Sequence, residues 1–273
     1  MAGVRSKALV HAFATVPREH FLGPGPWHIL VRSPDHHVEY RTTEDSDPRR
    51  LYSNVLVAID ASRGLNNGEP ASWAAWIDSL DIGTGEGVVH VGCGTGYYTA
   101  VLAEIVGPTG RVVGIQIDPV LAQRARTNLA YLSHVQVVAG NGSELDLGAA
   151  DVILVNAGAT HPRATWLNAM TPGGRLLLPI TGADDPNSIG FGGMFLITRR
   201  GTEYPAAFVS PVGIFPCVGV RDSESNRQLL RKNDPEWRAV RSLRRDVHEP
   251  DETCWLHTPD GCLSTLALAE DAA

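Results

Sequence analysis

The chain has 273 residues, of which 43% are hydrophobic, and it carries a formal net charge of −7 at neutral pH. This content suffices for one substantial core, so we expect a single elaborated domain rather than two equal ones. The acidic balance argues against a nucleic-acid partner, because a phosphate-binding face normally has a basic footprint. The basic stretch at residues 238–245 is flanked by acidic residues, so we interpret it as a solvated or ion-paired face.

The four cysteines are Cys93, Cys217, Cys254 and Cys262, and they show no Cys-x-x-Cys spacing. The sequence therefore suggests neither a zinc site nor a disulfide framework, and a reducing cytoplasm is the default location. No apolar run approaches the roughly 18 residues of a membrane span, and the N-terminus lacks the pattern of a signal peptide. We expect a cytoplasmic protein with no membrane partner and no metal.

Residues 1–80 mix short helical patterns with loops, and we interpret them as an N-terminal cap. Within this cap, the segment from Pro34 to Pro48 is charged and reads as a loop. It carries His36 and His37, which we interpret as solvated side chains rather than metal ligands.

A short apolar run at residues 88–91 leads into three glycines at alternate positions: Gly92, Gly94 and Gly96. Glycine lets the backbone turn tightly and approach a bound molecule, since a Cβ would force it away or forbid a positive φ. Residues 97–106 then place apolar side chains at helical spacing, so the loop presents helix N-terminal amides to a ligand. A dinucleotide fingerprint would need its third glycine at Tyr97. The pattern resembles instead the usual loop of S-adenosyl-L-methionine (SAM) methyltransferases, and the alternative is an ordinary tight turn between a strand and a helix.

Strand and helix signals alternate after this loop, as in a parallel sheet with crossover helices. The predicted strands are residues 88–91, 111–116, 135–139, 151–156 and 175–179, and the predicted helices are residues 97–106, 119–129 and 163–170. Two further strands, at residues 194–198 and 206–209, lack an intervening helix and are typical of an antiparallel pair. The sequence therefore predicts an α/β fold with a mostly parallel sheet.

The tail after residue 222 predicts a polar helix, a basic segment and a hairpin. In the hairpin, residues 254–257 and 262–264 flank the turn at residues 258–261. Trp237 and Trp255 indicate that this tail packs on the core.

The order and spacing of these segments resemble one family, the protein-L-isoaspartate O-methyltransferases. Residues 16–22, Val-Pro-Arg-Glu-His-Phe-Leu, look like its Val-Pro-Arg-Glu-x-Phe segment. Residues 88–114, 151–159 and 170–180 look like its glycine loop with the following helix and strand, its fourth strand and its fifth strand. The resemblance covers roughly residues 8–215.

The resemblance implies a Rossmann-like class I methyltransferase fold, with a mostly parallel seven-stranded sheet, an antiparallel last hairpin and helices on both faces. SAM would lie across the carboxyl ends of the first two strands, where open α/β sheets bind ligands. We expect three parts: the cap at residues 1–80, a SAM-binding core at residues 81–215, and an extension at residues 216–273 that packs on this core.

The resemblance also implies which residues bind the cofactor: His90, Gly92, Gly94, Thr95, Gly96, Tyr97, Gln116, Ile117, Asn141, Gly142 and Asn156. Three of these, His90, Gln116 and Asn141, stand where the family has carboxylates. Gln116 and Asn141 can still pair with hydroxyl and amino groups, at a loss of about 1 kcal/mol each. Asp118 is a candidate for part of the ribose contact. We expect His90 to be neutral, because an imidazolium would repel the cofactor's cations.

The family carries Thr-Ile-Ser-Gln-Pro before a helix, with the serine in its active site. The matching residues here are Asn66, Asn67, Gly68, Glu69 and Pro70, so that Gly68 replaces the serine. We assign the catalytic segment to Asn67, Gly68 and Glu69.

Asn66, His161 and Arg221 are candidates for orienting the substrate. Arg221 would hold a carboxylate bidentately. The alternatives are an exposed loop residue for His161 and a surface ion pair for Arg221.

A carboxylate acceptor is ionised at neutral pH and needs no general base, so catalysis would be chiefly positioning. We expect a SAM-dependent carboxyl O-methyltransferase acting on a protein, a peptide or a smaller acid, with isoaspartyl repair as the most specific version. One alternative is a methyltransferase for a modified peptide or natural product on the same scaffold. Another is a non-catalytic module that binds SAM or its product.

Overall fold

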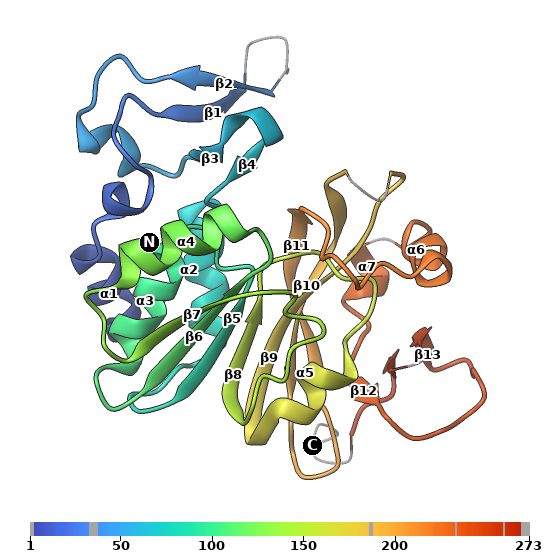
Figure 1. The fold of residues 1–273 in the computed structure, drawn as a ribbon. Coiled ribbons are helices and arrows are strands. Elements are labelled where there is room, and N and C mark those ends of the chain that lie inside the picture. Colours follow the sequence, from blue (N-terminus) through green and yellow to red (C-terminus); the bar gives the residue numbers. More distant parts are fainter. Residues whose placement is uncertain (1–2, 33–37, 186–187, 233, 259, 269–273) are drawn as a thin grey trace. The chain divides into compact units, whose positions relative to one another are not determined.

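The computed structural model describes residues 3–32, 38–185, 188–232, 234–258 and 260–268 (Figure 1). Its largest sheet has seven strands, in the order β11-β10-β9-β8-β5-β6-β7. These strands are β5 (Gly87–Val91), β6 (Arg111–Gln116), β7 (Val135–Ala139), β8 (Ala150–Val155), β9 (Met170–Gly182), β10 (Gly190–Thr198) and β11 (Ala206–Ile214). The pairs β5–β8, β6–β7 and β8–β9 are parallel, whereas β10 is antiparallel to both β9 and β11. The predicted mostly parallel sheet with an antiparallel last hairpin is confirmed.

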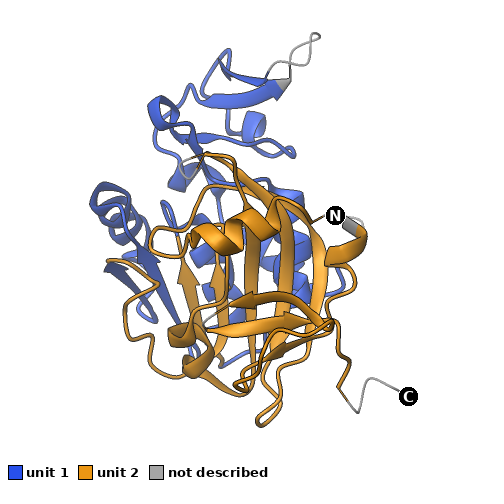
Figure 2. Ribbon diagram, turned by 90° about the vertical axis from the view of Figure 1, so that its right-hand side faces the viewer, with its two compact units in different colours: residues 1–85, 93–139 blue, residues 86–92, 140–273 orange. Residues whose placement is uncertain are grey.

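The chain divides into two compact units (Figure 2). The first comprises residues 1–85 and 93–139, and the second comprises residues 86–92 and 140–273. The helices of the first unit are α1 (Lys7–Thr15), α2 (Pro70–Ser79), α3 (Tyr97–Val106) and α4 (Pro119–Leu129). Helices α3 and α4 begin and end where the sequence predicts.

The ends of α3 and α4 follow from local chemistry. The Asp118 carboxylate accepts hydrogen bonds from the amides of Val120 and Leu121, and Pro119 occupies the first turn, so α4 has a side-chain cap at its N-terminus. Gly96 precedes α3 in the left-handed conformation. Helix α3 packs on β6, and nearly all of its side chains, Val101 among them, are buried, so part of the core of this unit lies between the two elements.

The N-terminal segment contains strands where the sequence predicts helical patterns and loops. Its elements are η1 (Arg18–Phe21), β1 (His28–Arg32), β2 (Val38–Thr42), η2 (Pro48–Leu51), β3 (Ala58–Asp60), η3 (Ala61–Arg63) and β4 (Leu65–Asn66). The prediction of a loop from Pro34 to Pro48 is wrong for β2, which pairs with β1. Most side chains of β2 are exposed, so it lacks the alternating pattern that marks a strand. His36 and His37 lie outside the described residues.

The first unit also holds a small apolar cluster near these strands. Its members are Leu22, Trp27, Leu51 and Val57, with Ile29, Val55 and Ile59 packed against them. These residues come from loops, short strands and the short helix η2, so no helical or strand periodicity in the sequence predicts the cluster.

The second unit carries α5 (Ala164–Ala169), α6 (Ser223–Leu229) and α7 (Asp234–Trp237), and a separate three-stranded sheet. This sheet has the order β12 (Ser242–Arg244), β14 (Gly261–Ser264) and β13 (Cys254–Thr258). The sequence predicts the hairpin of β13 and β14, whereas β12 falls in the basic segment, for which it predicts no strand. Pro259 of the predicted turn lies outside the described residues.

The tail of the second unit packs on the strands of the large sheet that belong to the same unit. The Trp255 ring lies 5.6 Å from the ring of Phe195 on β10, and the Trp237 ring lies 6.1 Å from the ring of Phe208 on β11. Arg244 pairs with Asp246 at 3.2 Å and with Asp251 at 2.9 Å. The basic stretch is therefore ion-paired at Arg244.

None of the helices in the described part of the chain has both the length and the apolar character that crossing a bilayer requires.

Candidate active site

The glycine loop has a positive φ at each alternate position: 81° at Gly92, 57° at Gly94 and 96° at Gly96. L-residues rarely adopt this region, so each position favours glycine. Gly96 is also restricted by packing, because a Cβ there would lie 2.8 Å from Leu129 Cδ1 on α4. A Cβ on Gly94 would make an ordinary contact, 3.6 Å from Ile59 Cδ1. The loop thus turns into α3 with the geometry that the sequence predicts.

Tyr97 and Thr95 are both buried. The Tyr97 ring packs against Phe13 and Phe21, with centroids 6.4 Å and 5.6 Å away, and burial raises the pKa of its phenol to about 12. The carbonyl of Thr95 accepts a hydrogen bond of 2.9 Å from Asn128 Nδ2. The Tyr97 side chain therefore packs against the N-terminal segment. A ligand at the glycine loop would contact the backbone of Tyr97 rather than its ring.

The residues after β6 form a bonded turn. Gln116 is 7% exposed, and its Oε1 accepts the backbone N–H of Asp118 at 3.2 Å. The Asp118 carboxylate caps α4 and pairs with Arg63, so the proposed ribose contact by Asp118 would have to compete with these partners. Ile117, between them, is 45% exposed and presents an apolar surface.

Gly68, in the segment that matches the family's Thr-Ile-Ser-Gln-Pro, has no room for a side chain. Its φ is 78°, and a Cβ would lie 2.2 Å from Trp73 Nε1 on α2. Trp73 in turn stacks on Tyr98, and the Tyr98 hydroxyl donates to the Gly68 carbonyl at 3.3 Å. The family's serine does not fit this loop conformation unless Trp73 moves.

A buried guanidinium, that of Arg18, is hydrogen-bonded to the same segment. Arg18 is 2% exposed, and its Nη2 donates to Asn67 Oδ1 at 2.9 Å and to the Gly68 carbonyl at 3.3 Å. It also donates to the carbonyls of Leu51 at 2.8 Å and Val55 at 2.7 Å. Burial lowers the pKa of Arg18 from its ordinary value. Sequence reasoning did not assign Arg18 a role, although it lies in the Val-Pro-Arg-Glu motif.

The other residues of the segment are bonded locally. Asn66 Oδ1 accepts the Gly68 amide at 3.0 Å, and Asn67 Oδ1 also accepts the Val57 amide at 3.2 Å. Glu69 precedes α2, and its Oε2 accepts from the Ser72 hydroxyl at 2.8 Å. Among the described residues, Asn67 Nδ2 is a buried donor with no hydrogen-bond partner.

In the second unit, Asn156 holds the first glycine of the loop. Its Nδ2 donates to the Gly92 carbonyl at 3.1 Å, and its backbone amide donates to the Val91 carbonyl at 2.8 Å. His90, on β5, is 1% exposed, and burial lowers its pKa to about 3. His90 is therefore neutral at physiological pH, as we expect.

Asn141 and Gly142 form the turn after β7. Asn141 Oδ1 accepts from the amide of Ser143 at 3.1 Å and from its hydroxyl at 2.9 Å. The Gly142 carbonyl accepts from the Trp166 indole at 2.7 Å. Hydrogen bonds to residues of the same unit therefore hold both Asn141 and Gly142.

His161 and Arg221 are the two predicted substrate contacts in the second unit. Both are less exposed than the alternatives, an exposed loop residue and a surface ion pair, would imply. His161 is 7% exposed, its Nδ1 lies 3.0 Å from the Thr160 hydroxyl, and burial lowers its pKa. Arg221 donates to the carbonyls of Gly158 and Thr181, at 3.2 Å and 2.8 Å, and to Asn226 Oδ1 at 2.9 Å. The Arg221 guanidinium thus donates these hydrogen bonds to neutral carbonyl and amide oxygens rather than to a carboxylate.

The protein-family model for protein-L-isoaspartate (D-aspartate) O-methyltransferase matches residues 43–188. The chain is similar to protein-L-isoaspartate O-methyltransferases of two organisms. It is 38% identical over 182 residues to that of Methanopyrus kandleri, covering 65% of this chain and 70% of the relative. It is 28% identical over 219 residues to that of Ignicoccus hospitalis, covering 79% and 90%.

Solved structures show the same fold. One, a protein-L-isoaspartate O-methyltransferase, matches with a TM-score of 0.62 and 20% identity, covering 89% of this chain and 68% of that one. Another is a putative protein-L-isoaspartate O-methyltransferase from Plasmodium falciparum in complex with S-adenosyl-L-homocysteine. It matches with a TM-score of 0.58 and 15% identity, covering 78% and 91%.

Proposed function

This chain belongs to the protein-L-isoaspartate O-methyltransferase family of SAM-dependent enzymes, and from that premise we propose that it methylates a side-chain carboxylate of a protein or peptide, with an isoaspartyl residue as acceptor. Membership of an enzyme family favours catalysis over the non-catalytic module.

One observation carries the proposal: the helix after the glycine loop is bonded to the segment assigned to the acceptor. Tyr98 is the second residue of α3, and its hydroxyl donates to the Gly68 carbonyl at 3.3 Å. Both belong to the first unit. A cofactor on the N-terminus of α3 would therefore meet an acceptor bound by residues 66–69, which is the proximity that group transfer needs.

The chemistry of the first unit suits SAM. The N-terminal amides of α3 favour the carboxylate at the amino-acid end of the cofactor. Gln116 Oε1 already accepts the Asp118 amide, so Gln116 Nε2 is the donor offered to the ribose hydroxyls. Exposed Ile117 provides an apolar surface for the adenine. The contacts of His90, Gly92, Asn141, Gly142 and Asn156 stay predictions from the family resemblance.

SAM, when bound, would supply the methyl group: an acceptor carboxylate oxygen would bond to its methyl carbon as the carbon–sulfur bond breaks with its electron pair left on sulfur. The residues of the chain then have to orient the carboxylate and exclude water. Asn67 Nδ2, a buried donor without a partner among the described residues, suits the acceptor oxygen if the loop adjusts. His161 and Arg221 keep their assignment as candidate substrate contacts, on the sequence argument alone.

The test is methyl transfer to a matched pair of peptides that differ in a single isoaspartyl or aspartyl linkage. With methyl-labelled SAM, we expect a base-labile methyl ester on the isoaspartyl peptide and none on its aspartyl twin. Absence of ester on the isoaspartyl peptide, under conditions in which calorimetry detects SAM binding, would refute this acceptor.

A second candidate is a carboxylate acceptor in a modified peptide or natural product. The packing of Trp73 against Gly68 favours this candidate. Trp73 occupies the space that a side chain at residue 68 would need, and the family has its serine at this position. Ester formation on such an acceptor but not on the isoaspartyl peptide would select it.

A further inference from the structure

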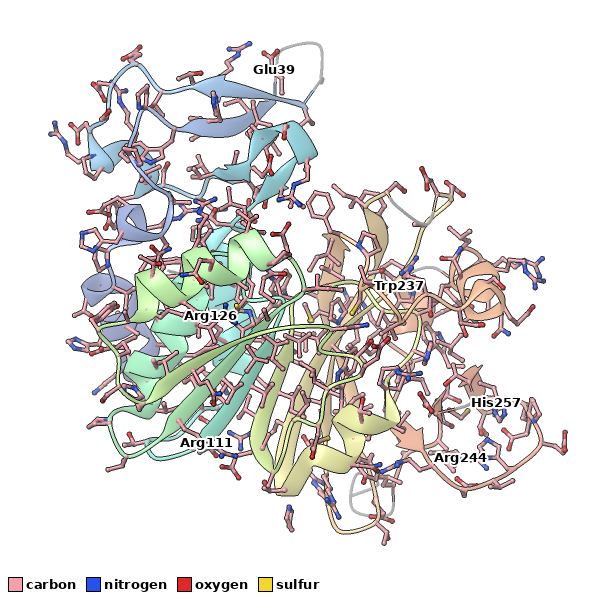
Figure 3. All side chains as sticks on the ribbon, viewed as in Figure 1. Glu39, Arg111, Arg126, Trp237, Arg244 and His257 are labelled. Carbon is pink, nitrogen blue, oxygen red and sulfur yellow. The ribbon has the colours of Figure 1, made fainter. Side chains whose placement is uncertain are left out.

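Two cysteines and two histidines converge in the three-stranded sheet of the second unit, although the sequence predicts no metal site. They are His248, Cys254, His257 and Cys262, and their ligand atoms all lie within 4.8 Å of one another. Cys254 and His257 are on β13, Cys262 is on β14, and His248 is in the connection between β12 and β13. Figure 3 labels His257 beside Arg244 in this region.

The strand pairing explains how the four side chains meet. His257 and Cys262 are opposite each other in the antiparallel register of β13 and β14. Residues three apart on a regular strand point to opposite faces. The register shifts between Cys254 and Leu256, however, and this irregularity brings Cys254 back to the face of His257.

The distances fit a tetrahedral ion. With Zn–S of about 2.3 Å and Zn–N of about 2.1 Å, sulfur and nitrogen ligands of one zinc ion lie about 3.6 Å apart. Cys254 Sγ lies 3.4 Å from His248 Nε2 and 4.0 Å from His257 Nδ1. These values lie on either side of the expected separation.

The neighbours of His248 orient its ring for metal binding. Its Nδ1 lies 2.9 Å from the Asp246 carbonyl and 3.2 Å from the Asp246 carboxylate. Both neighbours are acceptors, so they favour the tautomer with its proton on Nδ1, in which Nε2 directs its lone pair toward Cys254. A carboxylate behind a metal-bound imidazole is the usual outer partner in zinc sites.

A backbone amide of the connection between β12 and β13 also reaches the Cys254 sulfur. The backbone amide of Asp251 donates to Cys254 Sγ at 3.3 Å. Arg244, which pairs with both Asp246 and Asp251, fixes the connection that carries this amide and His248.

We propose that His248, Cys254, His257 and Cys262 bind one zinc ion that has a structural role. Thiolates with imidazoles in a tetrahedral set select zinc among the common metals. Four protein ligands leave no open position for a substrate, so the site is closed and non-catalytic. Zinc binding ties β13, β14 and the connection from β12 together, and it stabilises a sheet that is too small to hold a large core of its own.

The first test is metal content. The full chain, without a histidine tag, is purified under reducing conditions, incubated with ZnCl₂ and dialysed. We expect about one zinc ion per chain by elemental analysis. With CoCl₂, we expect intense visible bands of a tetrahedral site and a thiolate-to-cobalt absorption in the near ultraviolet.

The variants are Cys254→Ser and Cys262→Ser, and the matched control is Cys217→Ser, a buried free cysteine of the same unit that lies outside the cluster. The two ligand variants should lose the cobalt bands, whereas the control should keep them. Asp246→Asn should weaken zinc affinity roughly 10- to 100-fold without removing the bands, as outer-partner variants do.

Wild-type protein that retains no more zinc than Cys254→Ser, or that gives no thiolate band with cobalt, would overturn the proposal. A disulfide between Cys254 and Cys262 in protein that contains no metal, detected by mass spectrometry, would overturn it as well. If the ligand variants fail to fold, the wild-type zinc content and cobalt spectrum still decide.

Discussion

The Tyr98 ring lies flat on the Trp73 ring, with centroids 3.8 Å apart and an angle of 7° between the planes. Each ring also reaches Gly68, one through a hydrogen bond to its carbonyl and the other by occupying the space where a side chain would stand. The conformation of the proposed acceptor segment therefore depends on a pair of aromatic side chains from α2 and α3.

Tyr98→Phe tests this dependence, because it keeps the stacked ring and removes the hydrogen bond to Gly68. We expect it to destabilise the fold by about 1 kcal/mol. We also expect a higher KM for the acceptor with an unchanged Kd for SAM. The measurements are urea unfolding, methyl-transfer kinetics and calorimetry. Tyr131→Phe, at a 65% exposed position, is the control and should change none of them.

Gly68→Ser restores the family's residue at this position but should be destabilising, by about 1–3 kcal/mol, because it adds overpacking against Trp73 to backbone strain. Gly173→Ser separates the two effects. Gly173 has a φ of 80°, close to the 78° of Gly68, but a Cβ there would meet nothing within 4 Å. We expect Gly68→Ser to lower the unfolding midpoint more than Gly173→Ser does. Equal decreases in the unfolding midpoint would show that the Trp73 side chain moves aside at little cost.

Arg18→Lys keeps a positive charge and removes the forked geometry that reaches four acceptors. Buried oxygens that lose a donor are each costly, so we expect a loss of about 2–4 kcal/mol in unfolding free energy. The remaining folded protein should show a raised acceptor KM, because Asn67 and Gly68 lose their anchor. Surface Arg227→Lys, in an exposed pair with Glu224, is the control. An unchanged KM in Arg18→Lys would contradict the anchoring role.

Gln116→Glu restores the family's carboxylate at the end of β6. A charged acceptor strengthens hydrogen bonds to the ribose hydroxyls, so we expect SAM to bind roughly 3- to 10-fold more tightly. Gln123→Glu adds the same charge at an exposed position of α4 and serves as the control. Calorimetric titration with SAM measures both. Weaker binding in Gln116→Glu alone would indicate that repulsion from Asp118 prevails.

His90 should make folding stability depend on pH. Burial lowers its pKa to about 3, whereas an unfolded histidine titrates near pH 6.5. Between these values the unfolded chain binds a proton that the folded chain does not, so stability is complete above pH 6.5 and falls as the pH is lowered toward 3. The slope from this group is about 1.4 kcal/mol per pH unit.

Urea unfolding at several pH values in that window checks the prediction. His90→Gln should reduce the slope, whereas His11→Gln, at an exposed position of α1, should leave it unchanged. Equal slopes in the wild type and His90→Gln would mean that other groups carry the dependence.

The elements with strong periodicity were predictable, and those held by tertiary contacts were not. Helix α3 is largely apolar and lies between Gly96 and Gly107, and α4 has apolar residues at helical spacing after the capping Asp118, so the limits of both can be read from the sequence. Strand β2 is exposed on most of its length, and its partner strand supplies what the local sequence lacks.

The same distinction applies to the functional residues. The glycines of the loop have a local signature, and their backbone angles match it. The role of Arg18 depends on Leu51, Val55 and Asn67, which are distant in sequence, and therefore only the folded chain reveals it. The cluster of His248, Cys254, His257 and Cys262 depends on strand register and on one irregularity in β13. A search for paired cysteines could not detect it.

The Arg18 guanidinium joins η1, the end of η2 and the segment that precedes α2 through one set of hydrogen bonds. We expect these pieces to open together, because the release of any one would remove an acceptor from the same buried charge. They should therefore behave as one cooperative opening unit in native-state amide exchange, with the Asn67 and Val57 amides exchanging at similar free energies. Access to the acceptor segment would then be an all-or-none event of the N-terminal region.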